Sequence, residues 1–389
     1  MSPDRFVRDP ATVLGYATLA CFTFWLYAFG PALSLLRQEL GFSYTLLGFY
    51  SALWSLGSVA AGAGFARAAA HLSRGVLLWG SALVTAGGAA LFTLGSGVPT
   101  TLVGTAVMGV AGTTLLTVVQ AVLSDRHGDR RDKALTEANV GAGASAVVAP
   151  LVLGALATSV LGWRSAFALP VLVLVVLFLR SRGRPMPPPR RAPAGERGRL
   201  PAVCWLFAGL TALATAIEFC LVYFGAEVLI GTGLAPAAAA TALSSNYLGI
   251  LLGRLGGAAL TRRPGRTVGL LHGSLAVTAA GFALFWLSDS PMPAVVGLFL
   301  CGVGIANIYP LALALTLGAA RGHEDQANAR TQLLVGGLSA GSPYLIGTLA
   351  DHHGLGPALA VEPVLIGAAF VLLLVGVRVH RAERVLASA

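Results

Sequence analysis

The sequence contains very few charged residues. Asp, Glu, Lys and Arg make up 11% of its 389 residues, whereas a soluble domain carries about a quarter. Hydrophobic residues make up 56%, and the mean hydropathy is +0.78. Apolar runs repeatedly reach the roughly 20 residues that a helix needs to cross a bilayer. One such run could be a signal sequence, but about a dozen cannot be. The scarcity of charge therefore excludes a soluble protein and indicates a multi-pass membrane protein.

Cysteine is also scarce, and its pattern excludes a metal or disulfide framework. The four cysteines (Cys21, Cys204, Cys220 and Cys301) lie singly inside apolar stretches without CxxC spacing. We interpret them as small core hydrophobes. His352–His353 follows Asp351 but has no ligand partner at metal-site spacing. We therefore expect no metal and no cofactor.

Signals for enzymatic chemistry are missing as well. The only lysine, Lys133, follows Asp132, so no phosphate-binding loop with a Gly-Lys-Ser/Thr ending exists. Direct coupling to ATP within this chain is excluded. The stretch "GLSAG" (337–341) matches a nucleophile elbow, but it lies inside an apolar helix with no preceding strand. We expect the protein not to be an enzyme.

Turn residues and charge clusters divide the chain into twelve apolar spans. The sequence predicts an all-α membrane protein with two pseudo-symmetric six-helix bundles. The expected helices cover residues 12–36, 44–66, 75–96, 99–123, 137–159, 163–180, 201–229, 236–260, 267–288, 293–319, 327–349 and 357–378. An even number of spans places both termini on one side of the membrane.

Basic residues orient the chain, because short loops rich in Arg and Lys stay in the cytoplasm. With the N-terminus inside, the inside segments carry 23 of the 26 basic residues. The outside loops carry only Arg37 and Arg164, and Arg254 lies within a span. The net charge of +10 is therefore explained by topology. A nucleic-acid surface would need these arginines on one folded face, so we expect no nucleic-acid partner.

The most basic segment lies at the middle of the chain. "RSRGRPMPPPRRAPAGERGR" (180–199) carries seven arginines and a single acid, Glu196. Its prolines prevent the preceding helix from continuing, and its arginines hold it at the inner leaflet. We interpret residues 180–200 as a cytoplasmic linker. It would join an N-terminal bundle (residues 1–179) to a C-terminal bundle (residues 201–389).

The two halves resemble each other at a common offset of about 193 residues. This shift lays "NVGAGASAVVAPLVLG" (139–154) on "QLLVGGLSAGSPYLIG" (332–347). Pro150 then falls on Pro343, and Asn139 on Gln332. The shared offset agrees with two repeats of six helices.

Two further motifs carry a resemblance to a known family. The stretch "ALTRRPGR" (259–266) keeps Leu260, Arg263, Gly265 and Arg266 of the loop signature G-x-L-x-D-R-x-G-R, with Arg262 in place of the aspartate. The chain resembles the major facilitator superfamily along its whole length. The resemblance implies two six-helix bundles and alternating access, with Arg254, Arg262, Arg263 and Arg266 at the inner gate.

The expected fifth helix carries a second family motif, with small residues at every fourth position before a proline. Here it consists of Gly141, Ser145, Ala149 and Pro150. In the family this motif is commoner in exporters, which favours efflux. The arginine often found on the fourth helix is missing, because Thr105 lies about where it would be.

Glycine stripes indicate close contacts between membrane helices. Gly249, Gly253 and Gly257 form one stripe in the expected eighth helix, and Gly337 and Gly341 form a shorter one near Pro343. The resemblance implies that helices five with eight, and two with eleven, pack across the halves. We therefore expect these stripes to be surfaces that move during transport, while generic helix packing remains the alternative.

Glu218 is the only acid that lies well within an apolar helix of the sequence. It lies about 26 Å along the helix from Pro201, counting 1.5 Å per residue. Acids at such positions usually face a cavity or a partner. Glu218 is our candidate for binding a proton or the substrate, against a structural acid in an outer vestibule. Arg254 should lie at a different depth, so a direct pair with Glu218 is not expected.

Amides and aromatic residues supply further cavity candidates. In the family, helices one, four, seven and ten line the cavity, with five, eight and eleven contributing. The candidates on these helices are Phe24, Trp25, Tyr27, Gln120, Asn139, Tyr223, Asn246, Tyr247, Asn307, Tyr309 and Gln332. Acids near the inner loops are interpreted instead as partners in gate salt bridges: Asp125, Asp129, Asp132, Glu137, Glu324 and Asp325.

These observations predict a monomeric secondary transporter that moves a small organic solute by alternating access, coupled to protons. Export by antiport is favoured. An uptake symporter or a uniporter remains an alternative, and a non-transporting membrane sensor or scaffold is the alternative from another class. The excess of arginine over lysine and the abundance of alanine and glycine indicate a bacterial cytoplasmic membrane, with both termini in the cytoplasm.

Overall fold

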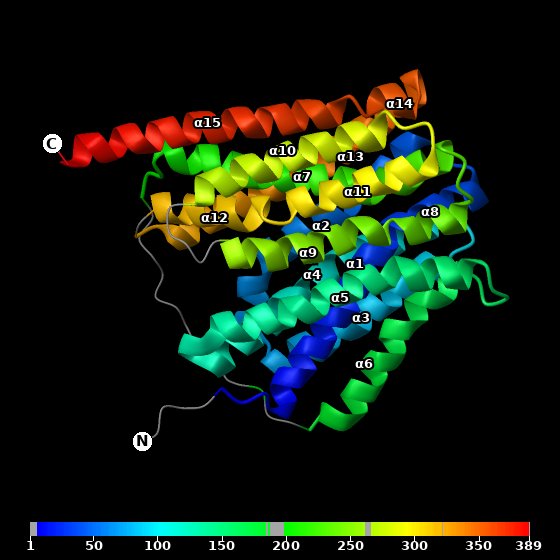
Figure 1. Ribbon diagram of the computed structural model, residues 1–389. Coiled ribbons are helices and arrows are strands. Elements are labelled where there is room, and N and C mark those ends of the chain that lie inside the picture. Colours follow the sequence, from blue (N-terminus) through cyan, green and yellow to red (C-terminus); the bar gives the residue numbers. More distant parts are fainter. Residues whose placement is uncertain (1–5, 184–185, 187–197, 261–265, 321, 389) are drawn as a thin grey trace. The chain divides into compact units, whose positions relative to one another are not determined.

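The computed structural model describes residues 6–183, 186, 198–260, 266–320 and 322–388. Over this part of the chain the structure is helical and contains no strand (Figure 1). In chain order the helices are α1 (Pro10–Leu40), α2 (Tyr44–His71), α3 (Arg74–Leu94), α4 (Val98–His127), α5 (Arg131–Ala157), α6 (Ala168–Ser181), α7 (Ala202–Gly231), α8 (Pro236–Ala242), α9 (Ser244–Leu260), α10 (Thr267–Trp286), α11 (Pro291–Ile305), α12 (Ile308–Ala319), α13 (Glu324–His353), α14 (Leu355–Ala358) and α15 (Val361–Ser388). Short 3-10 turns cover Gly128–Arg130 and Trp163–Phe167.

The structure contains helical segments for all twelve predicted spans. Among the described residues, eleven helical segments are long and apolar enough to cross a membrane. The remaining predicted span, residues 236–260, is built from α8 and α9, which are interrupted at Leu243. Because α9 alone has 17 residues, it falls short of the roughly 20 that span a bilayer. The protein is an all-α, multi-pass membrane protein, as the sequence predicts.

The chain divides into two compact units. One, here called the N-terminal unit, holds residues 1–32 and 53–192, and the C-terminal unit holds residues 33–52 and 193–389. The division falls inside α1 and inside α2, so the tips of these helices belong to the C-terminal unit. This differs from a boundary placed only at the linker, most of which lies outside the described residues.

The N-terminal unit is held by close helix packing and an aromatic core. A Cβ atom at Gly104 of α4 would lie 2.7 Å from the carbonyl oxygen of Gly88 in α3, so only glycine allows these backbones to approach. Phe92 stacks on Phe167 with ring centroids 5.4 Å apart. At the same end, Arg164 donates from Nε to the carbonyl of Thr93 at 2.8 Å. This pairing joins the end of α3 to the turn before α6.

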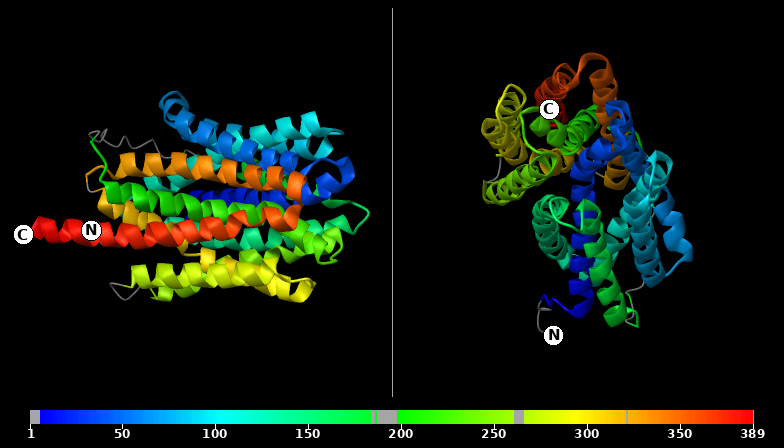
Figure 2. Two further views of the ribbon diagram at one scale, coloured as in Figure 1. Left: turned by 90° about the horizontal axis from the view of Figure 1, so that it is seen from above. Right: turned by 90° about the vertical axis from the view of Figure 1, so that its right-hand side faces the viewer.

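The C-terminal unit is organised around α7. This helix lies between α13 and α15, as the left view of Figure 2 shows. Its apolar side chains meet α10, α12 and α15 in one core, to which Leu210, Leu271, Ile308 and Leu373 contribute fully buried side chains. Because α7 is buried on nearly all sides, each polar group on it must find a partner within the protein.

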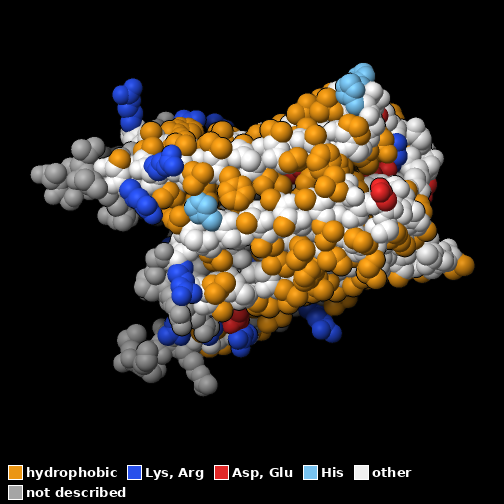
Figure 3. Space-filling view, turned by 45° about the horizontal axis from the view of Figure 1, so that its top comes forward, with side chains coloured by type: hydrophobic (Ala, Val, Ile, Leu, Met, Phe, Trp, Pro, Cys, Tyr) orange, Lys and Arg blue, Asp and Glu red, His pale blue; other side chains and the backbone are white. Residues whose placement is uncertain are grey.

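The surface is largely hydrocarbon. Hydrophobic side chains dominate the face drawn in Figure 3. Large apolar side chains such as Leu83, Leu94, Val160 and Met292 are more than half exposed. Apolar surface on this scale would be a liability in water, whereas lipid tails cover it in a membrane.

Candidate functional site

An enclosed ion pair of the C-terminal unit lies near the tip of α1. Arg37 of α1 pairs with Glu227 of α7, with 3.1 Å between Nη1 and Oε2. The Glu227 side chain is only 3% exposed and that of Arg37 is 23% exposed. The Arg37 guanidinium also lies 3.8 Å from the centroid of the Tyr44 ring, a cation–π contact. The pair therefore places two opposite charges in an enclosed site, where the Coulomb interaction between them is weakly screened.

A second acid fastens the start of α2 to the end of α13. The Asp351 carboxylate accepts hydrogen bonds from the backbone N–H groups of Tyr44 and Thr45, each at 2.8 Å. These N–H groups lie in the first helical turn, which has no acceptor of its own. A carboxylate is favoured there because it faces the positive end of the helix dipole.

Two glycines let the backbones of α2 and α13 touch beside this carboxylate. A Cβ atom at Gly48 would lie 2.8 Å from the Cα of Tyr344, and one at Gly347 would overlap the carbonyl of Tyr44. We call Arg37, Tyr44, Glu227, Asp351 and these two glycines the tip cluster. All of its members belong to the C-terminal unit.

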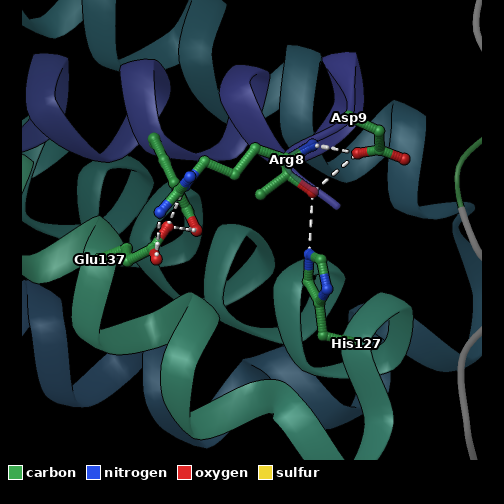
Figure 4. A network of polar contacts seen from close by, with 6 residues as sticks. Arg8, Asp9, His127 and Glu137 are labelled. Atoms are coloured by element: carbon green, nitrogen blue, oxygen red, sulfur yellow. Dashed lines mark hydrogen bonds and ion pairs between the residues drawn. The ribbon is translucent and has the colours of Figure 1, made fainter. Parts of the chain in front are cut away.

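The N-terminal unit carries a different polar network, shown in Figure 4. Arg8 holds Glu137 of α5 with two hydrogen bonds, 2.7 Å from Nε and 2.8 Å from Nη2. Tyr16 of α1 donates to the same carboxylate at 3.1 Å. Donating hydrogen bonds to the Glu137 carboxylate raises the pKa of the Arg8 guanidinium above its ordinary value, so Arg8 stays charged at any physiological pH.

The start of α1 is also tied to the end of α4. Asp9 accepts hydrogen bonds from the backbone N–H of Thr12 at 2.9 Å and from its hydroxyl at 2.7 Å, which caps the helix. The Thr12 hydroxyl lies 2.8 Å from Nε2 of His127, and Arg126 forms an ion pair with Asp9. These contacts clamp α1, α4 and α5 together at one end of the unit (Figure 4).

A buried ion pair adds α3 to this clamp. Arg74 donates from Nη2 to Asp125 at 2.9 Å, and the two side chains are 9% and 10% exposed. The interpretation of Asp125 and Glu137 as ion-pair acids is thus confirmed. Asp132, by contrast, is exposed and lies 3.8 Å from Arg131, where solvent screens the interaction.

Glu218 is the acid that the sequence places well within an apolar helix, and its role in binding a proton or the substrate stays a prediction. Glu218 is half-buried on α7. Two other acids in the spans are more deeply enclosed: Glu227, 5% exposed, and Glu362 at the start of α15, 0% exposed. Both fall inside the predicted spans 201–229 and 357–378, close to their ends. A search of the sequence for every acid inside a predicted span, including the ends of the spans, would have identified Glu227 and Glu362.

Several predicted amides connect helices of the C-terminal unit. Asn246 donates to the carbonyl of Leu298 at 2.9 Å, and Asn307 donates to that of Gly253 at 2.8 Å. Both bonds join α9 to the helix pair α11 and α12. Gln332 of α13 donates to the Tyr309 hydroxyl at 3.0 Å. Gln332 is exposed and Tyr309 half-buried, so this pair can still reach a solute.

Other candidates lie apart from these groups. Trp25 is fully buried and donates to the carbonyl of Phe167 at 3.0 Å, so it belongs to the core of its unit. Asn139 is exposed, and its amide bonds to the carbonyl of Leu135 in its own helix at 2.8 Å. The remaining positions are as follows: Phe24, Tyr223 and Tyr247 are buried, Tyr27 is half-buried, Gln120, Arg254 and Arg266 are exposed, and Arg262 and Arg263 lie outside the described residues.

The glycine stripe of α9 meets its own unit. A Cβ atom at Gly253 would lie 2.7 Å from the carbonyl oxygen of Val303. Gly249 and Gly257 likewise lie against Phe299 and Asn307. The helices that this stripe contacts belong to the same compact unit, which agrees with the alternative of generic helix packing; a role as a moving surface stays a prediction.

The other predicted packing positions divide into two groups. Ser145 donates to the carbonyl of Ala20 at 2.7 Å and joins α5 to α1, while Pro150 and Pro343 are buried inside their helices. Around Gly141, Gly337 and Gly341 a Cβ atom would meet no described atom within 4 Å. Close backbone contact at these three glycines is not present in the structure. The contact that α13 does make with α2 uses Gly347 instead.

These features define a class of protein. Apolar helices of membrane-spanning length, with ion pairs confined to their ends and amides between them, are those of a polytopic membrane transporter. The sequence model of the Major Facilitator Superfamily matches residues 14–341. The chain belongs to this superfamily, so the predicted resemblance is confirmed. No curated protein matches the sequence.

Solved transporter structures share the fold. A bacterial homologue of the human drug peptide transporters is 14% identical, with a TM-score of 0.77 over 98% of this chain and 100% of the other. The nucleoside transporter NupG is 14% identical, with a TM-score of 0.75 over 95% of this chain and 98% of the other. A bacterial homologue of the human lysosomal transporter Spinster is 15% identical, with a TM-score of 0.66 over 94% and 91%. At these identities the likeness shows the fold alone.

Proposed function

We propose that the protein is a proton-coupled secondary transporter that exports a small organic solute by alternating access. The observation that carries the coupling is the enclosed Arg37–Glu227 pair of the tip cluster. An acid within an apolar helix is costly, and such acids often mark proton or substrate pathways in membrane transporters.

The division inside α1 and α2 connects this pair to the transport cycle. Residues 33–52 belong to the C-terminal unit, yet they continue helices whose remaining residues belong to the N-terminal unit. Alternating access moves one repeat against the other, so the helix tips must leave α7 and α13 when that movement occurs. Glu227 then loses Arg37, and Asp351 loses the first turn of α2.

Protonation and movement are thereby linked. Without Arg37, the Glu227 carboxylate is either protonated or hydrated, because an isolated charge in an apolar site is unfavourable. Conversely, a proton on Glu227 removes the charge that Arg37 binds, which weakens the contact between the tips and α7. Protonation of Glu227 and separation of the helix tips from α7 therefore favour each other by the same free energy, as thermodynamic linkage requires.

The polar groups favour a neutral, amphipathic or cationic solute. The exposed or half-buried candidates Gln332, Tyr309, Gln120 and Asn139 offer hydrogen bonds and no positive charge. Glu218, half-buried on α7, adds one acid that can meet a cation. A multiply anionic solute would need several arginines, and Arg254 is the only basic residue that the sequence places well away from the ends of a span.

The export direction rests on the motif of α5. Ser145 and Pro150 stand at its expected positions, and Ser145 makes the contact between α5 and α1. Inverted and right-side-out membrane vesicles distinguish the directions. We expect proton-driven accumulation of the solute in inverted vesicles, whereas accumulation in right-side-out vesicles would identify an uptake symporter.

Coupling is tested with two matched variants on the same helix, Glu227→Gln and Glu218→Gln. A library of neutral and cationic solutes is first screened in inverted vesicles to find one that the wild type moves. We expect Glu227→Gln to lose gradient-driven transport and to keep energy-independent counterflow, because glutamine retains the shape but cannot carry a proton.

The exposed Asp289→Asn serves as the control and should behave as wild type. If Glu218→Gln alone loses uphill transport, the coupling acid is Glu218, as the sequence predicts. Normal uphill transport with an unchanged pH profile in both variants would identify a uniporter. The absence of any transported solute would favour a sensor or scaffold.

A further inference from the structure

Glu362 is a buried acid that the tip cluster does not use. It is the second residue of α15 and is 0% exposed. Neither Oε1 nor Oε2 accepts a hydrogen bond from any nitrogen or oxygen donor of the described residues. Its polar neighbours are the buried thiols of Cys220 on α7 and Cys301 on α11. The site is therefore a carboxyl between two uncharged thiols.

No cation balances this carboxyl. Within the described part of the chain no Lys, Arg or His forms an ion pair with Glu362, whereas Glu227 has Arg37. From α10, Thr278 contributes a carbonyl that accepts from Cys301 at 3.8 Å, and His272 lies against Phe370, two turns farther along α15. An unpaired carboxylate in such a site would cost several kcal/mol or more. A neutral carboxylic acid avoids this cost and can donate its proton to the Cys220 sulfur.

Glu362 lies close to the N-terminal end of its helix. It lies in the first turn of α15, about 3 Å along the axis from the start of the helix. The residues around it, Ala360, Pro363 and Val364, are exposed. The free N–H groups of a first helical turn favour an anion. Burial therefore favours the protonated form of Glu362. The N-terminal end of the helix favours its ionised form once water enters the site.

One face of α7 leads from this site toward the tip cluster. Cys220, Tyr223 and Glu227 are spaced i, i+3 and i+7, so they share one side of the helix over about 10 Å. Tyr223 is buried. Both acids thus lie against the same polar stripe in an otherwise apolar core. Glu227 lies beside a cation and Glu362 does not, and environments that differ in this way favour the ionised form of one acid and the protonated form of the other.

We propose that Glu362 is a proton-binding site of the C-terminal unit. In this conformation its carboxyl carries an exchangeable proton, while Glu227, paired with Arg37, carries none. The use of that proton in transport rests on the function proposed above, but its presence on Glu362 does not.

Infrared spectroscopy of the full-length protein in lipid tests the proposal without a substrate. At neutral pH, the wild type minus Glu362→Gln should show the carbonyl band of a protonated carboxylic acid. Ordinary carboxyls are ionised at this pH, so the exposed Asp289→Asn should remove no such band. Glu362→Asp keeps the acid and should shift the band, which covers the case in which the glutamine variant does not fold. On transfer to D2O the band should move within minutes.

Two results would overturn the proposal. Absence of the band at neutral pH would show that Glu362 is ionised, and a band unchanged after days in D2O would show a sealed, structural acid. Failure of proton-driven transport in vesicles would refute the proposed function and leave the infrared result as it is. The two proposals therefore fail separately.

Discussion

Single charged residues inside the apolar part of this protein obey one rule: they have a partner or they lose their charge. Arg37 has Glu227 and Arg74 has Asp125. Glu362 has only thiols as titratable neighbours. The reason is that the free energy needed to desolvate an ion exceeds the stabilisation that most single contacts provide. The protonation state of each acid therefore follows from whether a cation lies beside it.

This rule makes a prediction for the Arg37–Glu227 pair. Arg37→Leu leaves the Glu227 carboxylate enclosed without a cation, and we expect a loss of about 3 to 5 kcal/mol in the free energy of unfolding at neutral pH. The double variant Arg37→Leu with Glu227→Leu should recover much of this loss, because it removes the uncompensated charge. Thermal unfolding of the two single variants and the double variant in detergent measures the coupling.

The exposed Arg254→Leu is the matched control, since Arg254 is a basic residue of another span and is not enclosed. It should change the unfolding temperature little. Additive effects of Arg37→Leu and Glu227→Leu would show that the two side chains do not interact in the membrane-bound protein.

At the scale of helices, glycine decides which backbones can touch. The stripe in α9 lies against α11 and α12, and Gly48 and Gly347 bring α2 to α13. Sequence spacing identifies such stripes because every fourth residue falls on one face. The spacing says nothing about the helix on the other side. The α9 stripe was consequently expected at a moving surface and is found inside one unit.

Gly253 and Gly256 provide a matched pair on the same helix. A Cβ atom at Gly253 would lie 2.7 Å from the Ala306 Cβ atom, whereas one at Gly256 would meet no described atom within 4 Å. We expect Gly253→Ala to lower the unfolding temperature, at a cost of roughly 1 to 3 kcal/mol for overpacking. Gly256→Ala should be neutral or stabilising, because alanine favours the helix by up to about 1 kcal/mol.

Thermal unfolding with size-exclusion chromatography separates these outcomes. If Gly253→Ala is as stable as wild type but fails to transport, the stripe has a role in movement after all. Gly253→Leu, which adds more bulk at the same place, is expected to fail at assembly and not only at transport.

At the scale of the whole molecule, the distribution of arginine predicts the orientation in the membrane. Single cysteines introduced at Arg130 and Asp289 should be labelled from opposite sides, Arg130 from the cytoplasm and Asp289 from outside. Both positions are exposed. The four native cysteines are buried, so labelling by a membrane-impermeant maleimide should have little background.

Labelling in intact cells and in inverted vesicles reports the two faces. Labelling of both positions from the same face would contradict the twelve-span topology. A cysteine at Asp9 provides an internal check, because Asp9 shares its end of the N-terminal unit with Arg126 and should be labelled from the side that reaches Arg130.

The sequence by itself determined the class of the protein, the spans and the family. Each of these depends on properties that are local in the chain: hydropathy over about 20 residues, turn residues between spans, and short motifs such as "ALTRRPGR". Most helix edges shifted by a few residues, whereas α15 ends at Ser388, ten residues beyond the predicted end at residue 378. The break at Leu243 between α8 and α9 was not predicted, because the apolar pattern continues across it.

Only the tertiary structure decided which polar groups act together. Arg37 and Glu227 are 190 residues apart, and nothing local in either segment points to the other. Glu362 looks like a residue at a helix end, yet packing against α7 and α11 buries it completely. Burial and pairing depend on which helix faces which. The free energy that sets them comes from contacts distant in the chain, and no local pattern records it.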